Sequence, residues 1–168
     1  AALCIFEKDH RGLDNPEAAF LGAYTSAENN TNPLGQRPDG EGYSKAIEGS
    51  LRVAGVRKED IQVVKSHGTG TEVNNRAEKT ALQRSLGEFM ATSYKQRIGH
   101  TMGASGLLET GLLLNDLKRG IVPKILNRTE HDDVFLSYDA SAPNKGAFIS
   151  LAAGMGNVYS AAIFSTGM

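Results

Sequence analysis

Residues 63–78 read VVKSHGTGTEVNNRAE, and the stretch passes from an apolar run through a small-residue turn to a helical pattern. Its start is rich in β-branched residues, which favours a buried strand. His67 then opens a turn of glycines and threonines, in which glycine allows backbone conformations that other residues disfavour. Asn75 and Glu78 have the spacing of a capping box, so we expect a helix to begin near Arg76. The stretch therefore predicts a strand–turn–helix unit.

Strand-like and helix-like patterns alternate on both sides of this unit. The expected elements are strands over 1–6, 20–24, 61–65 and 90–94, helices from Tyr43 to Ala54 and up to about Lys118, and a hairpin of strands 148–151 and 160–164. The bend AAGMGN joins the last two strands. Such alternation predicts an α/β layered fold. Ligands of such sheets lie beyond the carboxyl ends of the strands, where both histidine turns of this chain are expected.

Composition limits the class of protein. The chain has 168 residues, of which 40% are apolar and 22% charged, as is typical of one soluble globular domain. A formal net charge of -1 argues against a nucleic-acid surface, and no apolar run is long enough for a membrane span. A single cysteine, Cys4, excludes an internal disulfide. With no visible signal peptide, we expect a cytoplasmic protein.

Two turns carry a histidine, HGT at 67–69 and GHT at 99–101. A single histidine near a strand end is usually a hydrogen-bonded structural residue, so neither turn is specific alone. No cluster supplies the further ligands that a metal would need, and we expect no metal site. GTGTEVN lacks the lysine of a phosphate-binding loop and the third glycine of a dinucleotide fingerprint.

Taken together, the motifs resemble those of the β-ketoacyl-acyl carrier protein synthases, the condensing enzymes of fatty acid and polyketide synthesis. HGTGT with Glu78 downstream, KQRIGHTMGASG and GMGN occur in the family's order, and RGIVPKILN resembles the family's segment after the second histidine. The resemblance covers nearly the whole chain. It implies a thiolase-like layered fold, with a mixed sheet covered by helices.

The resemblance also implies a reaction. A malonyl thioester loses carbon dioxide, and the resulting carbanion joins an acyl group held on an enzyme cysteine. His67 and His100 match the two donors to the enolate oxygen, and preorganised donors at such an oxygen are an effective form of catalysis. Lys95 and Glu78 match an ion pair that organises the electrostatics of the site.

Four further residues match positions that contact substrate in the family. Thr69 and Thr71 correspond to hydrogen-bonding partners of the phosphopantetheine arm of acyl carrier protein. Met155 stands after Gly154 at the place of a gating phenylalanine, whose backbone N–H contributes to an oxyanion hole. The resemblance implies no cofactor bound by the chain itself, since the substrate arrives on the carrier arm.

The chain departs from the family pattern at several positions. Cys4 lies in the apolar run AALCIFE, so we expect a buried strand residue and not the nucleophile. Residues 1–168 therefore resemble the C-terminal portion of a ketosynthase domain, with the cysteine-bearing N-terminal portion absent from this chain. Asn75 replaces an aspartate, Met155 a phenylalanine and Asn157 a glycine; Asn157 should still tolerate the turn.

The sequence predicts a β-ketoacyl synthase that is active only together with its cysteine-bearing part. The alternatives are a non-catalytic partner subunit resembling a chain-length factor and a thiolase-type relative. Expected partners are the cysteine-bearing part, acyl carrier protein and a second ketosynthase-like subunit in a homodimer or heterodimer, with no nucleic acid and no membrane. Acyl length and pathway, fatty acid or polyketide, stay open.

Overall fold

A computed structural model describes residues 2–4, 18–30, 32, 36–125, 140–143 and 146–166. Its main sheet has five strands in the order β1-β7-β6-β2-β3. The strands are β1 (Ala19–Ala27), β2 (Ile61–Lys65), β3 (Met90–Thr92), β6 (Gly146–Gly154) and β7 (Val158–Thr166). β2 runs parallel to β3 and β6, whereas β7 is antiparallel to β1 and β6, so the sheet is mixed as predicted. β4 (Ile121–Val122) and β5 (Ala140–Ser141) form a small second sheet.

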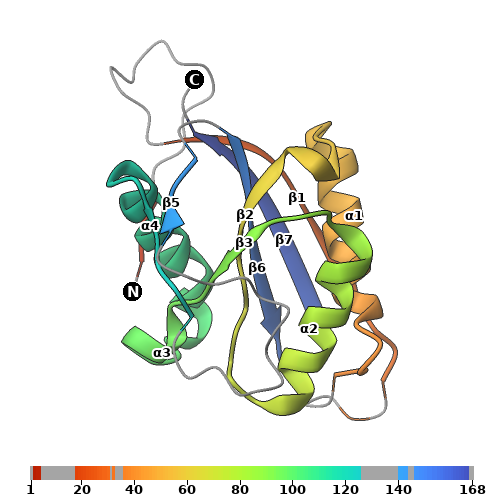
Figure 1. The fold of residues 1–168 in the computed structure, drawn as a ribbon. Helices are drawn as coiled ribbons and strands as arrows, with labels where there is room; N and C mark the ends of the chain where they lie inside the picture. The colour runs from red at the N-terminus through yellow and green to blue at the C-terminus, as the bar shows by residue number, and fades with distance from the viewer. Residues whose placement is uncertain are drawn as a thin grey trace.

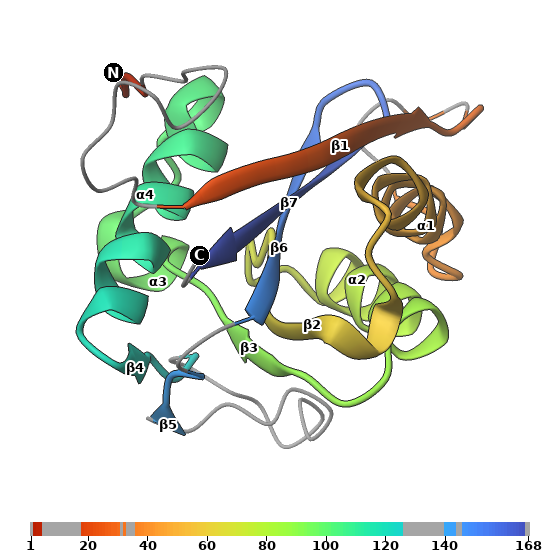
Figure 2. The same cartoon turned by 90° about the horizontal axis from the view of Figure 1, so that it is seen from above.

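Helices cover both faces of the main sheet. They are α1 (Glu41–Ala54), α2 (Glu72–Ser85), the short α3 (Lys95–Ile98) and α4 (Ser105–Lys118), with 3₁₀ turns η2 (Lys58–Asp60) and η3 (Met102–Ala104). α1 and α2 lie on one side of the sheet, and α3 and α4 lie on the other (Figures 1 and 2). Among the described residues, no helix is both long enough and apolar enough to cross a membrane.

Each face of the sheet has its own apolar core. Ile47, Leu82 and Ile149 belong to the core beneath α1 and α2, and Val63, Leu113 and Phe148 belong to the core beneath α4. Burying one such aliphatic side chain contributes about 1.5–3 kcal/mol. Because side chains alternate along a strand, Lys65 points to the same face as Val63, toward α4.

Several sequence predictions are confirmed. The strand over 61–65 is β2, and the expected hairpin is β6–β7, which extends further than predicted at both ends. α4 ends at Lys118 and is followed by Gly120 at φ 74°. Asn157 adopts φ 58° in the hairpin bend, and its side-chain amide donates to the carbonyl of Asn32 at 3.1 Å.

Three predictions are wrong. Ala2–Cys4 lie in no strand and Cys4 is exposed, so the expected buried strand is not found there; residues 1 and 5–6 lie outside the described part. α2 begins at Glu72, with Thr71 at the N-cap, and not near Arg76. The Glu78 carboxylate bonds to an earlier loop, so Asn75 and Glu78 form no capping box. The strand expected over 90–94 ends at Thr92, and the helical turn α3 begins at Lys95.

Candidate active site

His67 lies two residues beyond the end of β2, and its side chain is 5% exposed. The backbone N–H of Ala153 in β6 donates to its Nδ1 atom at 3.2 Å. A ring nitrogen that accepts a hydrogen bond carries no proton, so the neutral imidazole holds its proton on Nε2. Burial, then the nearby charges of Lys95 and Lys65, lowers the pKa of His67 to about 3. His67 is therefore a neutral N–H donor.

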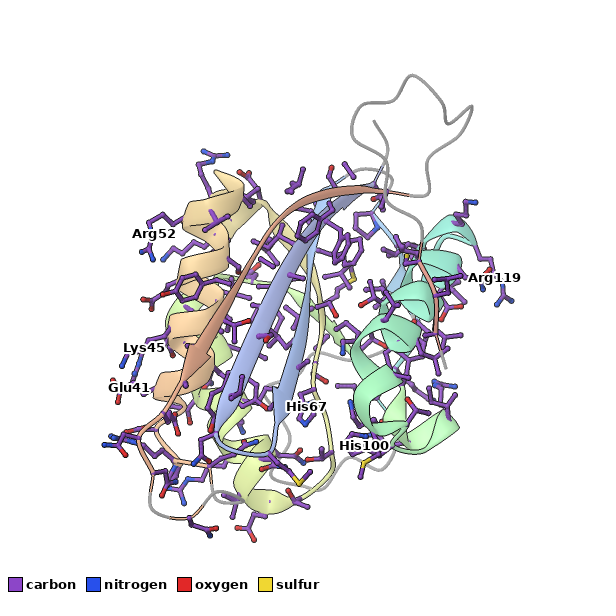
Figure 3. All side chains as sticks on the ribbon, turned by 180° about the vertical axis from the view of Figure 1, so that it is seen from behind. Glu41, Lys45, Arg52, His67, His100 and Arg119 are labelled. Carbon is purple, nitrogen blue, oxygen red and sulfur yellow. The ribbon has the colours of Figure 1, made fainter. Side chains whose placement is uncertain are left out.

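His100 reaches the same place from the turn between α3 and η3. The backbone N–H of Met102 donates to its Nδ1 at 3.1 Å, which leaves Nε2 as the donor nitrogen of the neutral ring. Met102 has φ 54°, an uncommon conformation for a residue other than glycine. The centroids of the His67 and His100 rings are 6.0 Å apart, and both rings lie at one end of the sheet (Figure 3).

Glu78 holds the turn that carries His67. Its buried carboxylate accepts the backbone N–H of His67 at 2.5 Å and that of Gly68 at 3.0 Å. Burial raises the pKa of Glu78, although these two hydrogen bonds oppose the effect. Gly68 has φ 55°, and a Cβ there would collide with the Ser93 hydroxyl, so this turn requires glycine.

The predicted ion pair between Lys95 and Glu78 is wrong, because the carboxylate partner of Lys95 is Glu109. Lys95 Nζ lies 2.7 Å from Glu109 Oε1, and it also donates to the backbone carbonyl of His67 at 2.5 Å. Glu109 projects from α4, 14 residues after Lys95, and its side chain is 0% exposed. The Ser105 hydroxyl donates to the same carboxylate oxygen.

A second lysine, Lys65, completes this cluster. Lys65 Nζ lies 3.1 Å from the other Glu109 oxygen, Oε2, and neither side chain is exposed. Burial alone would raise the pKa of Glu109, but the charge of Lys65 and the bonds from Lys95 and Ser105 outweigh it and hold the pKa below its ordinary value. The sequence analysis did not identify Lys65 or Glu109 as site residues. The signal that could have identified them is a charged residue in an otherwise apolar segment, at the end of β2 for Lys65 and within α4 for Glu109.

A cavity of about 570 Å³ opens beside the two histidines. Met155, at the tip of the β6–β7 bend, is 77% exposed at this cavity. The predicted residues His67, His100, Lys95, Gly154 and Met155 therefore meet at one site. The remaining lining residues are Lys65, Met102, Gly103, Ser105, Gly106, Ala152, Ala153, Val158 and Ser160.

The two predicted threonines lie on the loop after His67, outside the lining of this cavity. The side-chain amide of Asn74 donates to Thr69 Oγ1 at 2.6 Å, which leaves the Thr69 hydroxyl proton available to a ligand. Thr71 is exposed immediately before α2. Within the described part of the chain, no group of three or more His, Cys, Asp or Glu side chains is placed to hold a metal ion.

Residues 18–129 match the family described as "Beta-ketoacyl synthase, C-terminal domain". The chain is 30% identical over 155 residues to the tetracenomycin polyketide synthase ketoacyl synthase alpha subunit of Streptomyces glaucescens. It is 33% identical over 154 residues to the 3-oxoacyl-[acyl-carrier-protein] synthase 2 of Mycobacterium bovis. Both matches cover 88% of this chain and 36% of the relative, so the chain spans about a third of their length.

Solved ketosynthase structures share the fold of this chain. A β-ketoacyl synthase from Burkholderia phymatum superposes with a TM-score of 0.80 at 25% sequence identity. The ishigamide ketosynthase/chain length factor superposes with a TM-score of 0.76 at 25% identity. Each superposition covers 90% of this chain and 38% of the solved chain. A type II polyketide synthase acyl-carrier protein in complex with its ketosynthase gives a TM-score of 0.79 at 24% identity and supports the fold alone. This superposition covers 88% of this chain and 38% of the solved chain. The predicted thiolase-like fold is confirmed. The chain therefore belongs to the β-ketoacyl synthases, a family of transferases, and corresponds to their C-terminal domain.

Proposed function

We propose that this chain supplies the two histidine donors of a β-ketoacyl-acyl carrier protein synthase, which condenses malonyl-acyl carrier protein with an acyl group on an enzyme cysteine. The observation that carries the proposal is that both imidazoles accept a backbone N–H at the same nitrogen, Nδ1. A backbone N–H occupies Nδ1 of His67 and another occupies Nδ1 of His100, so each neutral ring presents an Nε2–H group. Two such donors from different elements lie beside one cavity.

The reaction fits this pair of donors. The bond between the malonyl carboxylate carbon and the adjacent carbon breaks, and carbon dioxide leaves without the bonding electrons. These electrons form a thioester enolate, whose negative charge lies on oxygen and accepts hydrogen bonds from His67 and His100. The enolate carbon then attacks the acyl carbonyl carbon, and the cysteine thiolate departs. One such donor typically contributes about 3 kcal/mol to lowering the barrier.

The surrounding residues keep the donors in place. Lys95 bonds to the carbonyl of His67 and to Glu109, and Glu78 bonds to the N–H groups of the His67 turn. We assign Lys95 to the electrostatic organisation of the site, with Glu109 as its partner. Glu78 acts through the backbone of the turn and needs no contact with substrate.

Substrate would enter from the exposed side of the cavity. Thr69 and Thr71 offer hydroxyl groups to the amides of a phosphopantetheine arm, on the loop that follows His67. The backbone N–H of Met155, which follows Gly154 at the end of β6, would contribute to the oxyanion hole of the acyl thioester, and its side chain would gate the acyl pocket. No cofactor is needed beyond the carrier arm.

The proposal requires partners. The cysteine nucleophile must come from an N-terminal ketosynthase part, and acyl carrier protein must deliver both thioesters. A second ketosynthase-like subunit would complete a homodimer or heterodimer. The name of the 3-oxoacyl-[acyl-carrier-protein] synthase relative supports a carrier-protein partner, and the solved ketosynthase/chain length factor supports a second subunit, both in general terms.

A non-catalytic partner subunit is the alternative. His67 and His100 place two imidazole donors beside one cavity. The buried ion pair between Lys95 and Glu109 supports the turn that carries His67. Both features favour the catalytic role, because a subunit without chemistry does not need such donors.

The test is release of labelled carbon dioxide from malonyl-acyl carrier protein by the assembled enzyme, meaning this chain together with its cysteine-bearing part. His67→Ala and His100→Ala should each lower the rate about 10²–10³-fold while the cysteine still accepts an acyl group. A wild-type assembly that takes up acyl groups yet releases no carbon dioxide would instead support the non-catalytic subunit.

A further inference from the structure

We propose that Lys65 is a positioning residue for His67, which locks the strand end that carries the imidazole and helps to keep that imidazole neutral. The catalytic consequence rests on the proposed function, whereas the effect on the state of His67 does not. The Lys65 ammonium group makes two hydrogen bonds inside the protein.

The first bond joins two strand ends. Lys65 Nζ donates to the backbone carbonyl of Leu151 in β6 at 2.7 Å. Lys65 lies two residues before His67, and Leu151 lies two residues before Ala153, whose N–H bonds to Nδ1 of His67. β2 and β6 run parallel with Lys65 opposite Ser150. The Lys65 bond therefore ties together the two chain segments whose relative position decides the His67–Ala153 bond.

The second bond places a cation near the ring. Lys65 Nζ lies 3.1 Å from Glu109 Oε2, and Lys95 Nζ lies 2.7 Å from Glu109 Oε1. Two buried ammonium groups thus share one carboxylate, and both lysines line the cavity with His67. Among the described residues, His100 beside the ring and Glu78 on its backbone N–H also bring ionisable groups to this place. A proton on His67 would add a further positive charge to this cluster.

Packing alone does not account for a lysine at this position. The Lys65 side chain is 0% exposed, and the removal of an ammonium group from water costs several kcal/mol unless charge and hydrogen bonds offset it. Apolar residues of similar volume often replace buried ion pairs without loss of stability. A residue that served only to fill the strand end would not need the charge, so its contribution lies in what the ammonium group does to the site.

The decisive variant is Lys65→Met, which keeps an unbranched side chain and removes the charge and both hydrogen bonds. In the assembled enzyme, kcat for carbon dioxide release should fall about 10- to 100-fold, as expected for a displaced catalytic group, with KM changed less than about threefold. NMR of histidine-labelled protein should show His67 protonation at a higher pH than in wild type. Lys58→Met, on the exposed turn η2, is the matched control and should change neither quantity.

A second variant separates position from charge. Lys65→Gln removes the charge and retains a donor for the Leu151 carbonyl, so it should lose less kcat than Lys65→Met and still raise the pH at which His67 titrates. Wild-type kcat with an unchanged His67 titration in a folded Lys65→Met protein would overturn the inference, as would failure of both variants to fold, since Lys65 would then be structural. A wild-type assembly without carbon dioxide release contradicts the proposed function, and the titration still tests Lys65.

Discussion

The backbone N–H of Ala153 lies 3.2 Å from Nδ1 of His67, so a single hydrogen bond between β6 and the end of β2 determines which nitrogen of the ring is a donor. The two residues are 86 positions apart in sequence. Because the bond comes from the main chain, no substitution of Ala153 other than proline removes the donor. The tautomer of His67 is thus a property of the sheet register.

Folding stability should depend on pH through His67. The pKa of His67 is about 3 in the folded protein, lowered mainly by burial, against 6.5 for an ordinary histidine. Between these values the unfolded state binds the proton and the folded state does not, so stability falls as pH falls from about 6.5 toward 3. Each pH unit inside this window costs up to about 1.4 kcal/mol. Urea unfolding of the assembled enzyme at pH 7 and pH 5 should show the loss, and His67→Gln should make it smaller. Titration of the ring near pH 6.5 would contradict this account.

Glu78→Gln tests the turn. The carboxylate accepts two backbone N–H groups, and an amide can keep only one of them on its oxygen while its NH₂ faces the other donor. We expect a loss of about 1–3 kcal/mol of stability and a lower rate of carbon dioxide release. Glu72→Gln, at an exposed position in the same helix, is the control. If the two variants behaved alike, Glu78 would not support the turn.

The ion pair of Lys95 can be measured by a double-mutant cycle. Glu109→Gln should cost about 3–5 kcal/mol of unfolding free energy, because it leaves two buried ammonium groups without their carboxylate. Lys95→Met should cost less, because Lys65 still pairs with Glu109. The double variant should cost less than the sum, since the two residues interact directly. Lys45→Met breaks an exposed pair with Glu41 and should cost at most about 1 kcal/mol. Additive effects in the cycle would contradict the pairing.

Met155→Phe tests the gate. Met155 is exposed at the cavity and has three rotatable bonds, so it can leave the space at lower strain than an aromatic ring. The substitution should lower kcat/KM for a bulky acyl substrate more than for a short saturated one, while the backbone N–H stays in place. Val53→Phe, exposed on α1 and outside the cavity, should affect neither substrate. An equal fractional change for both substrates would mean that Met155 does not select.

Local patterns in the sequence determined much of the fold. β-branched residues in 61–65, the glycine-rich bend before β7 and Gly120 after α4 act within a few residues of themselves, and each element was predicted close to its observed place. The grouping of His67, His100, Lys95 and Met155 at one cavity followed from motif order, because the carboxyl ends of neighbouring strands and the bend of the hairpin meet at one edge of the sheet.

Only the tertiary structure decided the pairing of charges. Glu78 and Glu109 are both buried helical glutamates, and spacing along the chain cannot say which of them meets Lys95. α2 directs Glu78 to the backbone of the His67 turn, whereas α4, packed against the opposite face of the sheet, directs Glu109 between Lys95 and Lys65. A buried ion pair depends on which helix covers which face, and that is set by the packing of side chains distant in sequence, which local propensity does not encode.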